Sequence, residues 1–222
     1  FLSGNPNDLL VIESDGDSIK EVESKLKILQ QKITKSKLSY ASTILLNSED
    51  QNKVWNIRKA GLGLLMKVPG DAKAIPFVED TAVSPEKLPE YVKRFDEIVR
   101  NHHTTAGYYG HASVGCLHIR PLINLKTHSD IEKMHSIAQD ISNLVIEFKG
   151  SMSGEHGDGI VRGAWTKKMF GNKVYQAFQE LKKAFDPKNI MNPGKIIDTP
   201  KMTSNLRYGE EYITYPIKTK LS

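Results

Sequence analysis

The chain has 222 residues, of which 39% are hydrophobic and 26% charged, and its formal net charge is +5. This composition is typical of a soluble globular protein that is large enough to bury a core. The basic balance admits an anionic partner, but no stretch combines clustered Lys and Arg with aromatic residues, so we expect no nucleic-acid partner.

The single cysteine, Cys116, excludes an internal disulfide and any multi-cysteine metal or iron–sulfur site within this chain. It fits a reducing compartment, and we expect a cytoplasmic protein. No segment resembles a signal peptide, and no apolar run approaches the roughly 18 residues of a membrane span. The chain begins with Phe1 rather than Met, which favours a piece of a longer protein.

The first part of the chain predicts alternating strands and helices. Ser18 with Glu21, and Ser48 with Gln51, have the spacing of a capping box at a helix start. The expected elements are a strand over 8–16, a helix over 19–34, a strand over 40–47 and a helix from 48 to about 66.

The second part predicts the order strand, helix, strand, strand, helix, strand over residues 76–155, which is the order of a split βαβ or ferredoxin-like unit. Its elements are a strand over 76–83, a helix over 88–99, strands over 104–112 and 115–123, a helix over 129–148 and a short strand just after it; a last helix covers 174–185. We therefore expect an α+β fold with a largely antiparallel sheet covered by helices.

One domain is expected over residues 1–197, with two ferredoxin-like halves of about 1–75 and 76–197. The polar remainder, 198–222, lacks periodicity and predicts a linker or strap towards a following domain.

Two histidines, His111 and His118, flank a predicted turn in "GHASVGCLH". On one straight strand, residues seven apart point to opposite faces, but a hairpin turn between them would let the two imidazoles meet. Glu155, in "SGEHGDG", follows the last strand and could supply a carboxylate beside them. Two imidazoles and one carboxylate suit Zn, Mn or Fe used as a Lewis acid.

Simpler interpretations stay open for the same residues. Each histidine could be a satisfied structural side chain, and Glu155 could cap a following helix, whose N-terminus favours anions. His156 could remain unligated and act as a base. The glycines around it would allow close backbone approach, but the Walker and dinucleotide-binding patterns are both missing.

Three further side chains have two interpretations each. Arg58 sits among apolar and glycine neighbours on a predicted helix, where it could hold a substrate carboxylate or simply face solvent. Lys73 could also reach an anion, although loop lysines are usually solvated. Cys116 is expected to be a core thiol.

Three motifs in order, "GHASVGCLH", "SGEHGDG" and "FDPKNIMNPGK", resemble the C-terminal, cap-type domain of the FAD-linked oxidases of the vanillyl-alcohol oxidase superfamily. This group includes D-lactate, glycolate and D-2-hydroxyglutarate dehydrogenases. "EDTAV" and "MTSNLRYGEEY" look like the branch in which an FAD-binding domain precedes this domain and an iron–sulfur module follows it.

The resemblance implies roles for particular residues. It makes His111, His118 and Glu155 the metal ligands and His156 the base near the flavin. It also implies substrate contacts by Arg58 and Lys73 and an approach of Asn192 to the isoalloxazine ring.

The sequence departs from the family pattern in two places. Ser113-Val114-Gly115-Cys116 replaces the usual Gly-Asp-Gly-Asn between the histidines, and Arg120 stands where an Asn is often found. An extra guanidinium near the site favours a more anionic substrate, such as a dicarboxylate, so we count Arg120 among the expected substrate contacts.

The expected function is therefore the substrate or cap domain of a flavin-dependent enzyme that oxidises a D-2-hydroxy acid by hydride transfer to FAD with a divalent metal. FAD would be bound mainly by a preceding domain, and a peripheral position at the inner face of a membrane would follow from the electron acceptor. The alternative is an inactive family member that acts as a binding or structural module. A stand-alone metal hydrolase is a further alternative, but it leaves "NPGK" unexplained.

Overall fold

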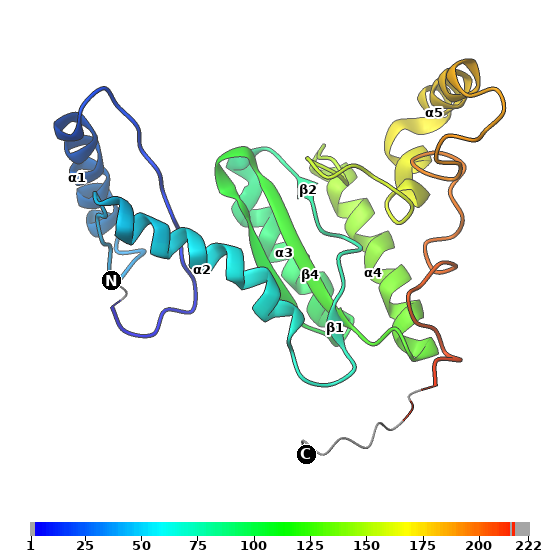
Figure 1. The fold of residues 1–222 in the computed structure, drawn as a ribbon, viewed down its shortest axis with the longest axis horizontal. Coiled ribbons are helices and arrows are strands. Elements are labelled where there is room, and N and C mark those ends of the chain that lie inside the picture. Colours follow the sequence, from blue (N-terminus) through cyan, green and yellow to red (C-terminus); the bar gives the residue numbers. More distant parts are fainter. Residues whose placement is uncertain (1–2, 214, 216–222) are drawn as a thin grey trace. The chain divides into compact units, whose positions relative to one another are not determined.

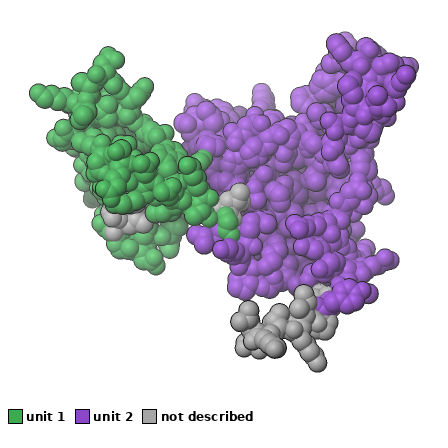
Figure 2. All heavy atoms as spheres, in the orientation of Figure 1, with its two compact units in different colours: residues 1–63 green, residues 64–222 purple. Residues whose placement is uncertain are grey.

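The computed structural model describes residues 3–213 and 215. The chain forms two compact units, residues 1–63 and 64–222 (Figure 2). No helix among the described residues is both long and apolar enough to cross a membrane.

Unit 1 consists of two helices, and both were expected from the sequence. Helix α1 covers Ile19–Ser36, and α2 covers Ser48–Met66, the last turn of which belongs to unit 2. At the start of α1, Oγ of Ser18 accepts a hydrogen bond from the backbone N–H of Glu21. The cap of α2 lies one residue earlier than predicted, because the side chain of Asn47 accepts the backbone N–H of Asp50 at 2.8 Å.

The predicted strands over 8–16 and 40–47 are wrong. Both segments are described, yet neither contains a strand residue. None of the described residues of unit 1 is buried. A helix satisfies its own backbone hydrogen bonds, whereas a strand needs a paired neighbour, and neither segment has a ladder partner here.

Unit 2 combines helices with a small antiparallel sheet, so the α+β class is confirmed (Figure 1). Its strands are β1 (Lys73–Ala74), β2 (Thr81–Ala82), β3 (Ala106–His111) and β4 (Cys116–Ile123), and its helices are α3 (Leu88–Asn101), α4 (His128–Glu147) and α5 (Thr166–Phe185). Short 3-10 helices cover Pro85–Lys87, Ala112–Val114 and Gly163–Trp165.

Strand β4 is the centre of the sheet. It pairs with β3 along six residues and with β1 and β2 near its two ends, all antiparallel. The elements after β2 follow the predicted order. However, β2, the first strand of the predicted ferredoxin-like unit, has only two residues, and the predicted last strand is a single bridge between Ala82 and Ser151. The α+β order is therefore present, while a ferredoxin-like unit is not confirmed.

The core lies between this sheet and α3 and α4. Its buried side chains include Tyr91 and Phe95 of α3, Ile141 of α4, and Ile119 and Ile123 of β4. Because side chains alternate along a strand, His118 and Arg120 point to the other face of β4. That face carries the polar residues described below.

The turn between β3 and β4 depends on Gly115. Its φ is +68°, a left-handed conformation that glycine adopts without strain. Its backbone oxygen accepts the N–H of Val83, and a Cβ atom at this position would lie 1.8 Å from the oxygen of Val83. The turn therefore joins the β3–β4 hairpin tightly to the end of β2.

The segment after α5 packs partly onto unit 2. Met202 is buried in the core, and Leu206 and Tyr208 contact it. Residues 214 and 216–222 of the predicted strap lie outside the described residues. The predicted domain boundaries stay a prediction.

Candidate functional site

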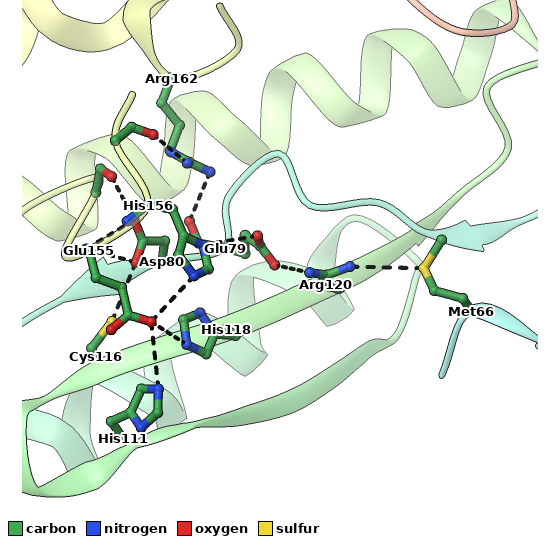
Figure 3. A network of polar contacts seen from close by, with 12 residues as sticks. Met66, Glu79, Asp80, His111, Cys116, His118, Arg120, Glu155, His156 and Arg162 are labelled. Atoms are coloured by element: carbon green, nitrogen blue, oxygen red, sulfur yellow. Dashed lines mark hydrogen bonds and ion pairs between the residues drawn. The ribbon is translucent and has the colours of Figure 1, made fainter. Parts of the chain in front are cut away.

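The two predicted histidines meet on the β3–β4 hairpin (Figure 3). His111 ends β3 and His118 lies in β4, and their ring centroids are 5.3 Å apart. The turn over 112–115 reverses the chain between them, as the hairpin interpretation requires. His118 is buried, whereas the side chain of His111 is 36% exposed.

Glu155 reaches the same place from the loop after α4. Its Oε1 atom lies 3.2 Å from Nε2 of His118, 3.6 Å from Nε2 of His111 and 3.3 Å from Nε2 of His156. The rings of His118 and His156 are stacked, with centroids 4.8 Å apart. Three imidazoles thus surround one carboxylate oxygen.

The loop that carries Glu155 and His156 is held by Asp80, which is completely buried. The carboxylate of Asp80 accepts the backbone N–H of Glu155 at 3.0 Å, that of His156 at 2.9 Å and the hydroxyl of Ser153 at 2.6 Å. Burial alone raises the pKa of Asp80, but these hydrogen bonds outweigh it and leave the pKa below its usual range. Asp80 is therefore a fixed anion beneath the loop.

Backbone contacts hold the same loop. Gly154 donates its N–H to the backbone oxygen of Asp80 at 2.7 Å. A Cβ on Gly154 would lie 3.0 Å from Sγ of Cys116 and 3.1 Å from Cβ of Ala82, so only glycine fits there without displacing a neighbour. Arg162 donates hydrogen bonds to the backbone oxygens of Gly157 and Glu79, and so it connects the loop of Glu155 to the segment that carries Glu79 and Asp80.

Cys116 is a buried core thiol, as expected. Its Sγ donates to Asp80 at 3.5 Å. Burial and the negative charge of Asp80 raise its pKa to about 12. A thiol of that kind stays protonated and is a poor nucleophile.

The sequence did not reveal two acidic residues of this site, Glu79 and Asp80. Glu79 is also buried; its Oε1 lies 3.3 Å from Nδ1 of His156, and its Oε2 forms an ion pair with Arg120 at 2.6 Å. A signal was present, because two adjacent acids within a predicted buried strand need partners. Their partners lie tens of residues away in the sequence, so local patterns do not identify them.

The remaining predicted contacts are less closely assembled. Arg120 lies on the same face of β4 as His118, and its guanidinium contacts Glu79 and Met66. Lys73 pairs with Ile123 in the sheet, five positions from His118, or about 17 Å along a strand. Their roles in substrate binding stay predictions.

Arg58 and Asn192 also stay untested. Arg58 belongs to unit 1, where its guanidinium lies 5.5 Å from the ring centroid of Trp55. Asn192 is exposed in the loop after α5 and has a φ of +48°.

The residues present fit a divalent cation. The three nitrogen–oxygen distances around Oε1 of Glu155 are close to about 3.4 Å. This is the distance between two ligand atoms of a tetrahedral ion whose bonds are about 2.1 Å long. Ligand atoms of Asp80, His118, Glu155 and His156 also lie within 4.8 Å of one another. Among the described residues, Asp80 and Glu155 form no ion pair with a lysine or arginine. The negative charge of these carboxylates is therefore not neutralised by such a pair and favours a bound cation.

An α+β unit with a cluster of imidazoles and carboxylates on one face of its sheet defines a domain with a candidate metal centre. The chain belongs to the family of FAD linked oxidases, C-terminal domain, whose model matches residues 4–196.

Individual relatives support this placement. A D-2-hydroxyglutarate dehydrogenase of Pseudomonas putida is 35% identical over 190 residues, which cover 84% of this chain and 18% of that protein. Another of Escherichia coli is 36% identical over 155 residues, covering 68% of this chain and 15% of that protein. A D-lactate dehydrogenase of Archaeoglobus fulgidus is 31% identical over 159 residues, covering 71% and 33%. The chain therefore spans a small part of the length of these relatives.

Proposed function

We propose that this chain is the substrate domain of a flavin-dependent D-2-hydroxyacid dehydrogenase. The observation that carries the proposal is the position of three imidazoles around one oxygen of Glu155. The relatives named D-2-hydroxyglutarate dehydrogenase favour a dicarboxylic hydroxy acid as substrate. Family membership favours FAD, held mainly by a preceding domain, and an iron–sulfur module is a further proposed partner.

His111, His118 and Glu155 would hold the divalent ion, Zn, Mn or Fe. Asp80 is the less suitable ligand, because its oxygens already accept hydrogen bonds from the loop. The pKa of His118 is lowered by its burial and by the nearby His156, which favours the neutral imidazole that a metal requires.

His156 would take the proton of the substrate hydroxyl. Its Nδ1 faces Glu79 and its Nε2 faces the cluster, so one ring nitrogen is directed to where the substrate would bind. The bound groups would supply hydride acceptance, from the flavin, and Lewis-acid polarisation, from the divalent ion. Arg58, Lys73 and Arg120 are the proposed contacts for substrate carboxylates.

The proposal is tested with the full-length protein and its His156→Ala variant. Single-turnover reduction of the flavin by D-2-hydroxyglutarate should slow by about 10²–10⁴-fold in the variant, with bound FAD unchanged. An unchanged rate would refute the base role. A parent protein that binds FAD but is not reduced by 2-hydroxy acids would favour a binding or structural module instead.

A further inference from the structure

Glu79 is a buried acid with contacts on both sides. Its side chain is 9% exposed, and its two oxygens face different residues: Oε1 lies 3.3 Å from Nδ1 of His156, and Oε2 lies 2.6 Å from a terminal nitrogen of Arg120 (Figure 3). The carboxylate therefore lies between a guanidinium and the imidazole to which the proposed function assigns proton transfer.

Arg120 fixes the direction of this carboxylate. Its side chain is 11% exposed, its other terminal nitrogen contacts Sδ of Met66, and its guanidinium carbon lies 5.9 Å from the ring centroid of Tyr109. Because a guanidinium keeps its positive charge, it attracts the nearest oxygen of Glu79 as an ion pair. The other oxygen is then left to face His156.

The second oxygen of Glu79 orients the imidazole of His156. An ionised carboxylate can only accept hydrogen bonds, so it attracts the N–H edge of the ring at Nδ1. The opposite ring nitrogen, Nε2, then faces the cluster, 3.3 Å from Oε1 of Glu155.

We infer that Glu79, held by Arg120, is a positioning residue that orients the ring of His156 and keeps Nε2 directed into the site. This inference rests on the proposed function, because it acts through the base assigned there. The two acids of "EDTAV" then have separate roles: Asp80 holds the backbone of the loop, and Glu79 orients the imidazole of His156.

Glu79→Gln tests the inference, because glutamine has the same shape. Arg120 would attract the amide oxygen of the new side chain, so the amide N–H₂ would face Nδ1 and would no longer attract an N–H there. In the full-length holoenzyme we expect the rate of flavin reduction by D-2-hydroxyglutarate to fall by about 10–100-fold, with FAD and metal content unchanged. Glu79→Asp keeps the charge and should recover part of the rate.

The matched control is Glu147→Gln. Glu147 forms an exposed ion pair with Arg94 elsewhere in unit 2, and its variant should reduce the flavin at the parent rate. A loss of the same size in this control would show that breaking any such pair slows the enzyme, and it would overturn the inference.

The decisive comparison repeats Glu79→Gln in the His156→Ala background. If Glu79 acts through His156, the second substitution causes no further loss there. An equal loss in both backgrounds overturns the inference, as does a parent rate in Glu79→Gln alone.

A crystal structure of the full-length Glu79→Gln variant gives a readout that does not depend on turnover. A rotated or displaced His156 ring supports the inference, and a ring in its parent position contradicts it. If His156→Ala reduces the flavin at the parent rate, the proposed function fails in its base assignment, and the ring position alone decides the role of Glu79.

Discussion

The carboxylate of Asp80 accepts a hydrogen bond of 2.9 Å from the backbone N–H of His156, although the two residues are 76 positions apart in the chain. This contact and the parallel one to Glu155 set the path of the loop before any ligand binds. Such preorganisation reduces the cost of ordering the loop when a ligand arrives.

Asp80→Asn should therefore destabilise the protein and loosen the site. An asparagine retains one acceptor oxygen, but the loss of charged hydrogen bonds should lower the free energy of unfolding by about 1.5–3 kcal/mol. Denaturant titration measures this change. Asp71→Asn, which removes an exposed carboxylate paired with Lys126, is the control and should change stability by less than about 1 kcal/mol.

The same carboxylate predicts an acid-sensitive contribution to stability. Since the pKa of Asp80 is lowered in the folded protein, its contribution is present above the ordinary value of about 4 and is lost as the pH falls through the lowered value. Parent and Asp80→Asn should therefore differ less in stability near pH 3 than at pH 6. A difference that does not depend on pH would contradict the prediction.

Metal content tests the proposed ligands directly. Purified full-length protein should contain near-stoichiometric divalent metal by mass spectrometry, and Glu155→Gln and His118→Ala should each lose it. His128→Ala removes an exposed histidine paired with Glu210 and should leave the metal in place. Unchanged metal in His118→Ala would refute the ligand set.

The turn between β3 and β4 predicts a large difference between two glycine variants. Gly115→Ala combines a left-handed backbone with a clash against Val83, whereas Gly70 is also left-handed, with a φ of +89°, but has no neighbour within 4 Å. Gly70→Ala should cost about 1–2 kcal/mol from backbone strain alone, and Gly115→Ala clearly more. Equal melting temperatures would show that the turn relaxes freely.

Cys116 should resist alkylation in the native protein. With a pKa of about 12, its thiolate fraction at pH 8 is about 10³-fold below that of an ordinary cysteine. Iodoacetamide followed by peptide mass spectrometry should find this residue unlabelled until denaturant is added. Rapid labelling without denaturant would show that the thiol is accessible and ionised.

The sequence was most informative where structure is determined locally. The helix from Ile19 was predictable from its cap and its apolar periodicity, and the helix from Leu88 from its periodicity, because both signals act within a few residues. The proximity of the His111 and His118 rings was predictable because a short turn separates the two residues. The expected approach of Glu155 followed from strand order alone.

What the sequence could not reveal depends on contacts distant in the chain. The segments 8–16 and 40–47 have the composition of strands, but composition does not supply a ladder partner. Glu79 and Asp80 also appear as ordinary strand residues until the loop of residues 151–156 is placed beside them. Burial of an acid is decided by its neighbours, and those neighbours are some 75 positions away.

Strand β4 contributes to both the site and the core, because its alternate side chains point to opposite faces of the sheet. His118 and Arg120 face the carboxylates, while Ile119 and Ile123 face the helices. Inserting or deleting one residue in the strand ahead of His118 would exchange the two sets, because side-chain direction alternates along a strand. An insertion or deletion of two residues would leave each set of side chains on its own face. Individual side chains of this strand can therefore diverge among related proteins far more readily than its length, which is free to change only in even steps.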